Sequence, residues 1–213
     1  NALGLKRDSR LKFSKQDYTK FLSDDETAIA EKYENGSTLF DLVENWLERT
    51  PFLEEKDFIF WKSYKKSIKN MIDNDINIIN NNPNLNEESK NDQLENYNKI
   101  TNNYDALFDV DKYKKLIENG SKRLSQKASH AALFIMLYRN EPILQTPYRL
   151  ITKLIDIDQS LNAWRYKHAL LAQRMIGIKI GSGGSSGHSY LKKTLGKHSI
   201  FDDYANLSTY LIP

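Results

Sequence analysis

Apolar residues recur along most of the chain at a spacing of three to four, the period that places them on one face of an α-helix. In STLFDLVENWLERTP the pattern predicts a helix that begins after a Ser37 or Thr38 cap and ends before Pro51. A second helix is predicted over 57–79, and a helix that is apolar on nearly every side follows a Ser125 cap. No stretch has the alternation typical of a strand, so we expect an all-α fold.

Further along, NEPILQTP predicts a turn over 140–147, and the longest periodic stretch follows it over 148–176, as one bent helix or two. Residues 74–103 hold 12 asparagines in 30 positions, with Pro83 near the middle. Such a bias is typical of a solvated hairpin tip. We therefore expect a single all-α domain over 1–213 with an asparagine-rich helical-hairpin excursion at about 74–103.

Composition excludes several classes of protein. The chain of 213 residues is long enough to bury a core, and it has no cysteine. A disulfide framework, a zinc–thiolate cluster and a thiol nucleophile are thereby excluded, and a cytoplasmic location is expected. The 31 basic and 28 acidic residues leave a net charge of +3 without a basic stripe, so no nucleic-acid partner is expected. No apolar run is long enough to cross a bilayer, so we expect no membrane partner.

Histidines are the first candidates for chemistry. His168 lies in LNAWRYKHALLAQRMIG, in the middle of an apolar helical stripe. Such an imidazole suits an axial heme ligand because porphyrin is a large apolar disc, and it equally suits a core histidine bonded to a carbonyl. His130 sits on an equally apolar helix, so periodicity does not choose between the two. His188 and His198 fall in or near loops. The residues that share the face of His168 are Leu161, Trp164, Leu171 and Met175.

Two other groups have both a functional and a structural interpretation. Asp156 and Asp158 are a candidate carboxylate pair, but side chains two residues apart diverge on a helix, which favours capping of the next helix. In WLERTP, an indole and a guanidinium lie one turn apart and could hold a flat ligand, as a second indole site. A partly buried tryptophan beside a surface arginine is the favoured alternative. The residues of this candidate site are Trp46, Arg49 and Pro51.

A glycine-rich segment follows the His168 stripe. Five of the nine glycines lie between Gly177 and Gly187, in GIKIGSGGSSG. The dinucleotide fingerprint fails because Gly181 and Gly183 would require a glycine at position 186, where serine stands, and the phosphate-loop motif is absent too. Glycines allow close backbone approach, and the serine hydroxyls can hold a carboxylate or an ammonium group. Composition alone leaves a binding loop and a plain linker equally open.

The segment WRYKHALLAQRMIGIKIGSGGSSGHSYL, followed by FDDYANLSTYLIP, resembles the C-terminal region of the tryptophan 2,3-dioxygenase family. That family carries a W-R-Y/F-x-H segment, then R-M-[IL]-G, a G-T-G-G-S-S-G loop and N-L-S-T-Y-L-I-P. Weaker matches extend back through RLSQKASHAALFIMLYRNEPILQTPYRLI and LVENWLERTP. The resemblance thus covers most of the chain apart from the asparagine-rich stretch.

The resemblance implies an all-α dioxygenase with one heme b per subunit, assembled as a homotetramer. It implies insertion of both atoms of O₂ across the indole C2=C3 bond of L-tryptophan to give N-formylkynurenine, the first step of the kynurenine pathway. His168 falls on the family's proximal heme iron ligand, and Trp164 in its heme pocket. The loop would cover the substrate, with Ser182 at the substrate's amino-acid end. The loop residues are Gly181, Ser182, Gly183 and Gly184.

Three departures from the family pattern matter. Ser182 stands where the family usually has threonine, and His188-Ser189 where it usually has Tyr-His. The family's N-terminal half, which supplies the distal histidine and the arginine that clamps the substrate carboxylate, is missing before Asn1. We therefore expect the N-terminal segment of the same enzyme as a partner, and assign no catalytic residue to this chain. The alternatives are a non-catalytic heme-binding or scaffold module, and an all-α interaction domain whose glycine loop is a linker.

Overall fold

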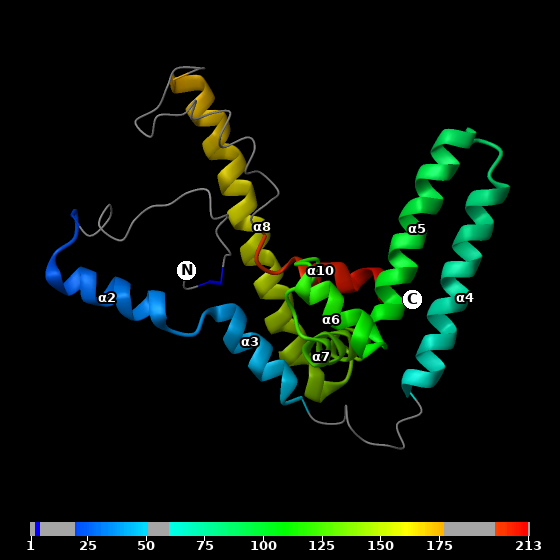
Figure 1. Cartoon of the computed structure of the whole chain (residues 1–213), viewed down its shortest axis with the longest axis horizontal. Coiled ribbons are helices and arrows are strands. Elements are labelled where there is room, and N and C mark those ends of the chain that lie inside the picture. Colours follow the sequence, from blue (N-terminus) through cyan, green and yellow to red (C-terminus); the bar gives the residue numbers. More distant parts are fainter. Residues whose placement is uncertain (1–2, 5–19, 51–59, 177–198, 213) are drawn as a thin grey trace. The chain divides into compact units, whose positions relative to one another are not determined.

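The structure is a computed structural model that describes residues 3–4, 20–50, 60–176 and 199–212. These residues form helices and their connections, without a strand among them, which confirms the all-α prediction (Figure 1). In chain order the elements are α2 (Asp24–Asn35), α3 (Leu39–Glu48), α4 (Phe60–Asn81), α5 (Glu87–Leu107), α6 (Val110–Glu118), α7 (Gln126–Leu137), α8 (Pro142–Ile176), α10 (Asp202–Asn206) and the 3₁₀-helix η1 (Leu207–Tyr210).

The chain divides into two compact units, each built from segments far apart in the sequence. The first unit comprises residues 1–45 and 149–205, and the second comprises 46–148 and 206–213. The expectation of a single domain over 1–213 stays a prediction.

In the first unit, α3 begins where its sequence predicts. The Thr38 hydroxyl accepts a hydrogen bond from the Asp41 amide at 3.2 Å, and the Asp41 carboxylate accepts one from the Thr38 amide at 2.9 Å. This reciprocal capping box satisfies two amides that would otherwise lack a partner at the helix start. It also fixes the buried Phe40 ring, whose centroid lies 6.3 Å from those of Phe201 and Tyr204. The apolar contact of these rings joins α3 to the C-terminal segment.

In the second unit, the asparagine-rich stretch forms the facing ends of α4 and α5, which pack side by side as a hairpin (Figure 1). Asn86 caps α5 by accepting from the Ser89 amide at 2.7 Å, and the Tyr97 hydroxyl donates across the hairpin to Asp75 at 3.1 Å. Asparagine serves here as a polar surface and cap residue. The inward face of α4 is apolar at helical spacing and consists of Tyr64, Ile68, Ile72 and Ile79.

Within α7, every residue from Ala131 to Met136 is buried, as expected for a helix segment that is apolar on nearly every side. The Ser125 hydroxyl accepts from the Ala128 amide at 3.2 Å, which confirms the predicted cap, and it also donates to Glu48 at 2.5 Å. The C-terminal η1 packs on α7, and the Tyr64 hydroxyl donates to the Tyr210 carbonyl at 2.5 Å. The last described residues are thus part of this core.

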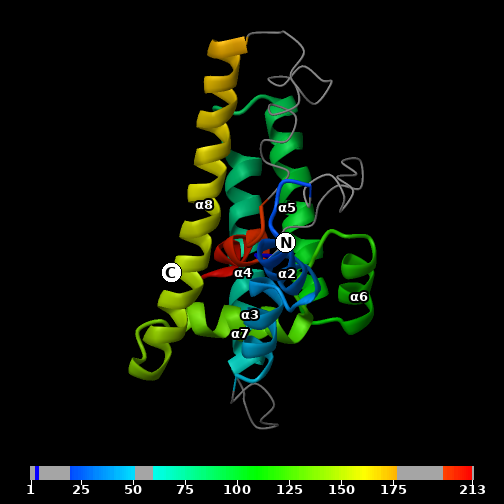
Figure 2. The same ribbon diagram turned by 90° about the vertical axis from the view of Figure 1, so that its left-hand side faces the viewer.

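The turn predicted over 140–147 is wrong in its extent: the chain turns over 138–141, and α8 already begins at Pro142 and runs unbroken to Ile176 (Figure 2). Pro142 takes the first helical position, where the missing amide costs nothing. Pro147 lies inside the helix and cannot donate to the Ile143 carbonyl, a loss that the 35-residue helix tolerates near its start. The one-helix alternative for the following stretch is therefore the correct one. None of the described helices is both long and apolar enough to cross a membrane.

Candidate functional site

His168 lies in the C-terminal half of α8, on the outside of the first unit. Its side chain is exposed, and so are the apolar side chains around it on the same helix face. Trp164 is 61% exposed, Leu171 53% and Met175 75%. Large apolar side chains that gather on one exposed face mark a surface that a ligand or another protein segment covers. We call this set, Trp164, His168, Leu171 and Met175, the His168 ridge.

The Trp164 indole holds the imidazole of His168 in a defined orientation. The two rings are nearly parallel and offset, with centroids 5.3 Å apart and planes tilted by 6°. They lie one helical turn apart, which brings their side chains together. Within the described part of the chain, no hydrogen bond to the ring nitrogens of His168 is seen. The imidazole is therefore oriented by its stacking on Trp164.

His130, the competing histidine, belongs to the core of the second unit. Its Nε2 lies 2.6 Å from the Leu107 carbonyl oxygen, the C-terminal residue of α5, so Nε2 carries the proton and donates. The ring lies 5.0 Å from that of Trp61 and 5.2 Å from that of Phe108. Burial lowers the pKa of His130, and the positive charge of Lys65 lowers it further, while the hydrogen bond that the ring donates to the Leu107 carbonyl raises it by less than burial lowers it. His130 is therefore a core histidine bonded to a backbone carbonyl, which the sequence analysis gave as the alternative to an axial heme ligand.

The lowered pKa of His130 predicts a loss of stability in mild acid. Below the unfolded pKa of about 6.5 the unfolded chain takes up a proton that the folded chain binds less readily. The free energy of unfolding therefore falls as the pH drops from 6.5 towards the folded pKa. His130→Gln keeps an amide donor for Leu107 and does not titrate, so its urea midpoint should vary less between about pH 7 and pH 5 than the wild-type midpoint. An equal pH dependence in both proteins would contradict the assignment.

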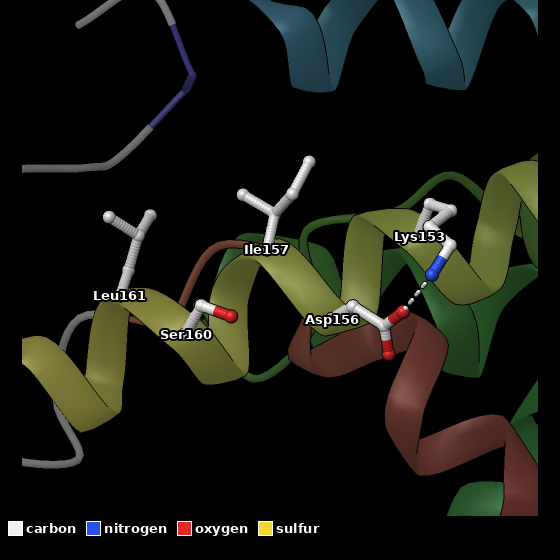
Figure 3. A pocket seen from close by; sticks show the side chains of 5 residues that line it. All are labelled: Lys153, Asp156, Ile157, Ser160 and Leu161. Atoms are coloured by element: carbon white, nitrogen blue, oxygen red, sulfur yellow. Dashed lines mark hydrogen bonds and ion pairs between the residues drawn. The ribbon is translucent and has the colours of Figure 1, made fainter.

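An open hollow of about 340 Å³ lies beside α8, at the N-terminal side of the His168 ridge (Figure 3). Ile157 and Leu161 project from one side of the helix and form its apolar wall, while Lys153 and Asp156 form an ion pair of 2.8 Å at its edge. Ser160 completes the lining. Because Leu161 precedes Trp164 on α8, this hollow extends the apolar surface toward the ridge.

The two aspartates of LIDIDQSL do not form a pair, and neither caps a helix that follows it directly. Both lie inside α8, where Asp156 is on the surface and Asp158 is buried. Asp158 accepts hydrogen bonds from the amides of Ile200 and Phe201, just before α10. Sequence spacing missed this contact because its partners lie more than forty residues away. The only local signal was a carboxylate among apolar positions.

The remaining candidate residues are placed in part. Trp46 is half-buried at the end of α3 and Arg49 is exposed just after it, while Pro51 lies outside the described residues. The second indole site therefore stays a prediction. Ser182, Gly181, Gly183, Gly184, His188 and His198 also lie outside the described residues. No cluster of three metal-ligating side chains occurs in the described part of the chain, and a single axial imidazole would not form one.

Comparison with known proteins identifies the family of the chain. The family model of tryptophan 2,3-dioxygenase matches residues 1–211. The chain is 47% identical over 211 residues to the tryptophan 2,3-dioxygenase of Bdellovibrio bacteriovorus, with 99% of the chain and 59% of that protein aligned. It is 43% identical to that of Alteromonas mediterranea, with 100% and 59% aligned, and 37% identical to that of Mus musculus, with 100% and 52% aligned.

The chain thus spans about 59% of the length of the two bacterial relatives. The matched range, residues 1–211, includes the asparagine-rich stretch at about 74–103. The family match covers 211 of the 213 residues. The chain belongs to the tryptophan 2,3-dioxygenase family.

Proposed function

We propose that this chain supplies the heme-binding helix of a tryptophan-oxidising dioxygenase, the enzyme that converts L-tryptophan and O₂ to N-formylkynurenine. The observation that carries the proposal is the state of the two histidines. His130 is committed to the Leu107 carbonyl, whereas His168 is exposed on an apolar ridge. A proximal heme ligand needs the second condition.

The residues of the ridge fit heme b. A porphyrin covers its neighbours with an apolar disc, and Trp164, Leu171 and Met175 offer an exposed apolar surface on either side of His168. When bound, heme supplies the iron chemistry with O₂, which no side chain can supply. His168 would hold the iron, and Trp164 would keep the imidazole from turning about its side-chain bonds.

Other residues of the chain would bind and shield the substrate. The family resemblance supports Ser182 as a hydrogen-bonding group for the amino-acid end of tryptophan, within the segment that holds Gly181, Gly183 and Gly184. Apolar side chains of the ridge would exclude water from the reacting indole. Positioning and water exclusion are the main contributions that a protein makes to such a cofactor reaction.

The partners follow from the same proposal. L-tryptophan and O₂ are the substrates, and the N-terminal segment of the same enzyme would supply the other wall of the site. The chain spans about 59% of the length of its bacterial relatives, so the part of those proteins that it does not cover is long enough to hold such a segment. A homotetramer and a cytoplasmic location are further parts of the proposal, supported by the family resemblance and by the absence of cysteine.

Isotope labelling tests the proposal. The protein is loaded with heme, combined with the N-terminal segment, reduced and given L-tryptophan under ¹⁸O₂. We expect N-formylkynurenine that carries two ¹⁸O atoms, and no product from indole-3-propionate, which lacks the amino group. Heme binding without labelled product would instead favour a non-catalytic heme module. Absence of heme binding would favour an interaction domain.

A further inference from the structure

Helix α8 carries a second apolar face beside the one that it buries. Ile151 and Leu154 belong to the core of the first unit and are 1% and 3% exposed. Leu150 and Ile157 are 43% and 41% exposed, and Leu161 is half-buried. Successive residues of a helix are turned by about 100°, which places these three side chains within about 40° of one another, at the edge of the buried face. Large apolar side chains in such a position mark a surface that another segment covers.

The hollow of about 340 Å³ beside α8 lies on this second face (Figure 3). Four of its five lining residues are spaced as i, i+3, i+4 and i+7 along the helix, namely Lys153, Asp156, Ile157 and Ser160. Four residues with this spacing form the hole into which a side chain of a neighbouring helix inserts. The spacing therefore favours a helix as the occupant of the hollow, rather than a flat ligand or an extended chain.

The same face also supplies a side chain that fits such a hole. Leu150 is exposed and precedes the centre of the hollow by six to seven residues, a rise of about 10 Å along the helix. A two-fold axis that crosses α8 near Lys153 would place the Leu150 of each copy over the hollow of the other. In a two-fold interface the same surface occurs on both subunits and each contact is made twice. The face thus holds both a hole and the side chain that fills it.

The charges at the edge of the hollow are self-complementary in the same arrangement. Lys153 and Asp156 lie on the side of the apolar face that is turned away from the core, and they form an ion pair of 2.8 Å. Their side chains are 75% and 47% exposed, so each keeps surface for a second charge of opposite sign. Antiparallel pairing about the two-fold axis would bring each lysine next to the partner's aspartate. One copy therefore offers the charges that the other requires.

We propose that the face formed by Leu150, Lys153, Asp156, Ile157 and Leu161 binds the same face of a second copy of this chain, as a pair of antiparallel helices. The inference assigns a surface to the homotetramer of the proposed function and rests on that self-assembly. It does not depend on heme or tryptophan, because no residue of the face belongs to the His168 ridge. The N-terminal segment is the competing occupant, and the test separates the two.

Sedimentation equilibrium of the chain combined with the N-terminal segment tests the apolar contact. In Leu150→Asp we expect the mass of the assembly to fall by about half, since loss of a two-fold interface divides a dimer, or a tetramer built from two dimers. Gln159→Asp is the matched control, because it introduces the same charge at an exposed position on the opposite side of α8. It should leave the mass unchanged. Circular dichroism shows whether either variant has lost helix.

An exchange of charges tests the antiparallel pairing independently, also where Leu150→Asp fails to fold. Lys153→Glu makes every charge of the cluster negative, and Asp156→Lys makes every charge positive. Each variant by itself should therefore dissociate, with a Kd for self-association raised at least about tenfold. An equimolar mixture of the two variants should regain the mass of the unsubstituted assembly and should lose it again as salt is added.

Four results would overturn the proposal. They are an unsubstituted protein with one copy of the chain per particle, an unchanged mass in Leu150→Asp, unchanged self-association in both charge variants, and a mixture of these variants that stays dissociated. Loss of the N-terminal segment from Leu150→Asp at an unchanged copy number would identify that segment as the occupant instead. Failure of the proposed dioxygenase function is a different result, since the mass is measured without heme and without tryptophan.

Discussion

Replacing His168 with alanine is expected to remove the Soret band that wild-type protein develops when it is titrated with heme in the presence of the N-terminal segment. The reason is that the imidazole supplies the nitrogen ligand of the ridge, while the large side chains of Trp164, Leu171 and Met175 contribute apolar contact. Loss of groups that merely support a metal ligand costs about 10- to 100-fold in affinity, so loss of the ligand itself should exceed about 100-fold. Turnover of tryptophan should fall below detection.

The matched control is Lys167→Ala, at an exposed neighbouring position that points away from the ridge. It should bind heme as wild type does. A full Soret band in His168→Ala would remove His168 from the iron and with it the proposed heme site. Free imidazole offers a second check, because it should restore part of the band to the alanine variant if the cavity left by the side chain accepts it.

The second large effect concerns stability. Leu133→Ala should lower the free energy of unfolding by about 2–5 kcal/mol, the range found when a fully buried leucine is truncated and leaves a cavity. Leu133 lies in the middle of α7 with no exposed surface, on a helix whose neighbours Ala132 and Phe134 are buried as well. Because every residue of α7 from Ala131 to Met136 is buried, the surroundings of Leu133 have little freedom to collapse into the gap. Urea unfolding followed by helical circular dichroism measures the change.

Ile78→Ala is the control for this prediction. Ile78 lies inside α4 and is 57% exposed, so its truncation removes little buried surface and improves helix propensity. We expect a change within about 0.5 kcal/mol. Equal losses for Leu133→Ala and Ile78→Ala would contradict the packing of α7.

Local chemistry made several elements predictable from the sequence. The caps at Thr38 and Ser125 involve donors and acceptors three residues apart, so the residue types alone indicate them. Periodicity likewise indicated the helices. It failed at 140–147, where two prolines suggested a turn, because Pro142 suits a first helical position and Pro147 comes early enough for the helix to tolerate it.

The candidate site was less predictable because its deciding contacts are distant in the sequence. His130 and His168 have equally apolar helical neighbours, and what distinguishes His130 is its hydrogen bond to the Leu107 carbonyl, 23 residues earlier in the chain. The role of Asp158 depends on amides more than forty residues later. Spacing along one helix carries no information about such partners. The motif resemblance to the family favoured His168 without that information.

The division of the fold into two discontinuous units has a consequence for how the chain matures on the ribosome. The Tyr64 hydroxyl is bonded to the Tyr210 carbonyl, 146 residues later, and at about 5–20 residues per second that partner is synthesised some 7 to 30 seconds afterwards. Residues 149–205 likewise complete a unit that begins at residue 1. Local elements such as the α4–α5 hairpin can form early. Neither core can close until the residues up to about 205–210 have been synthesised, so α7 lacks its η1 partner from its own synthesis until then.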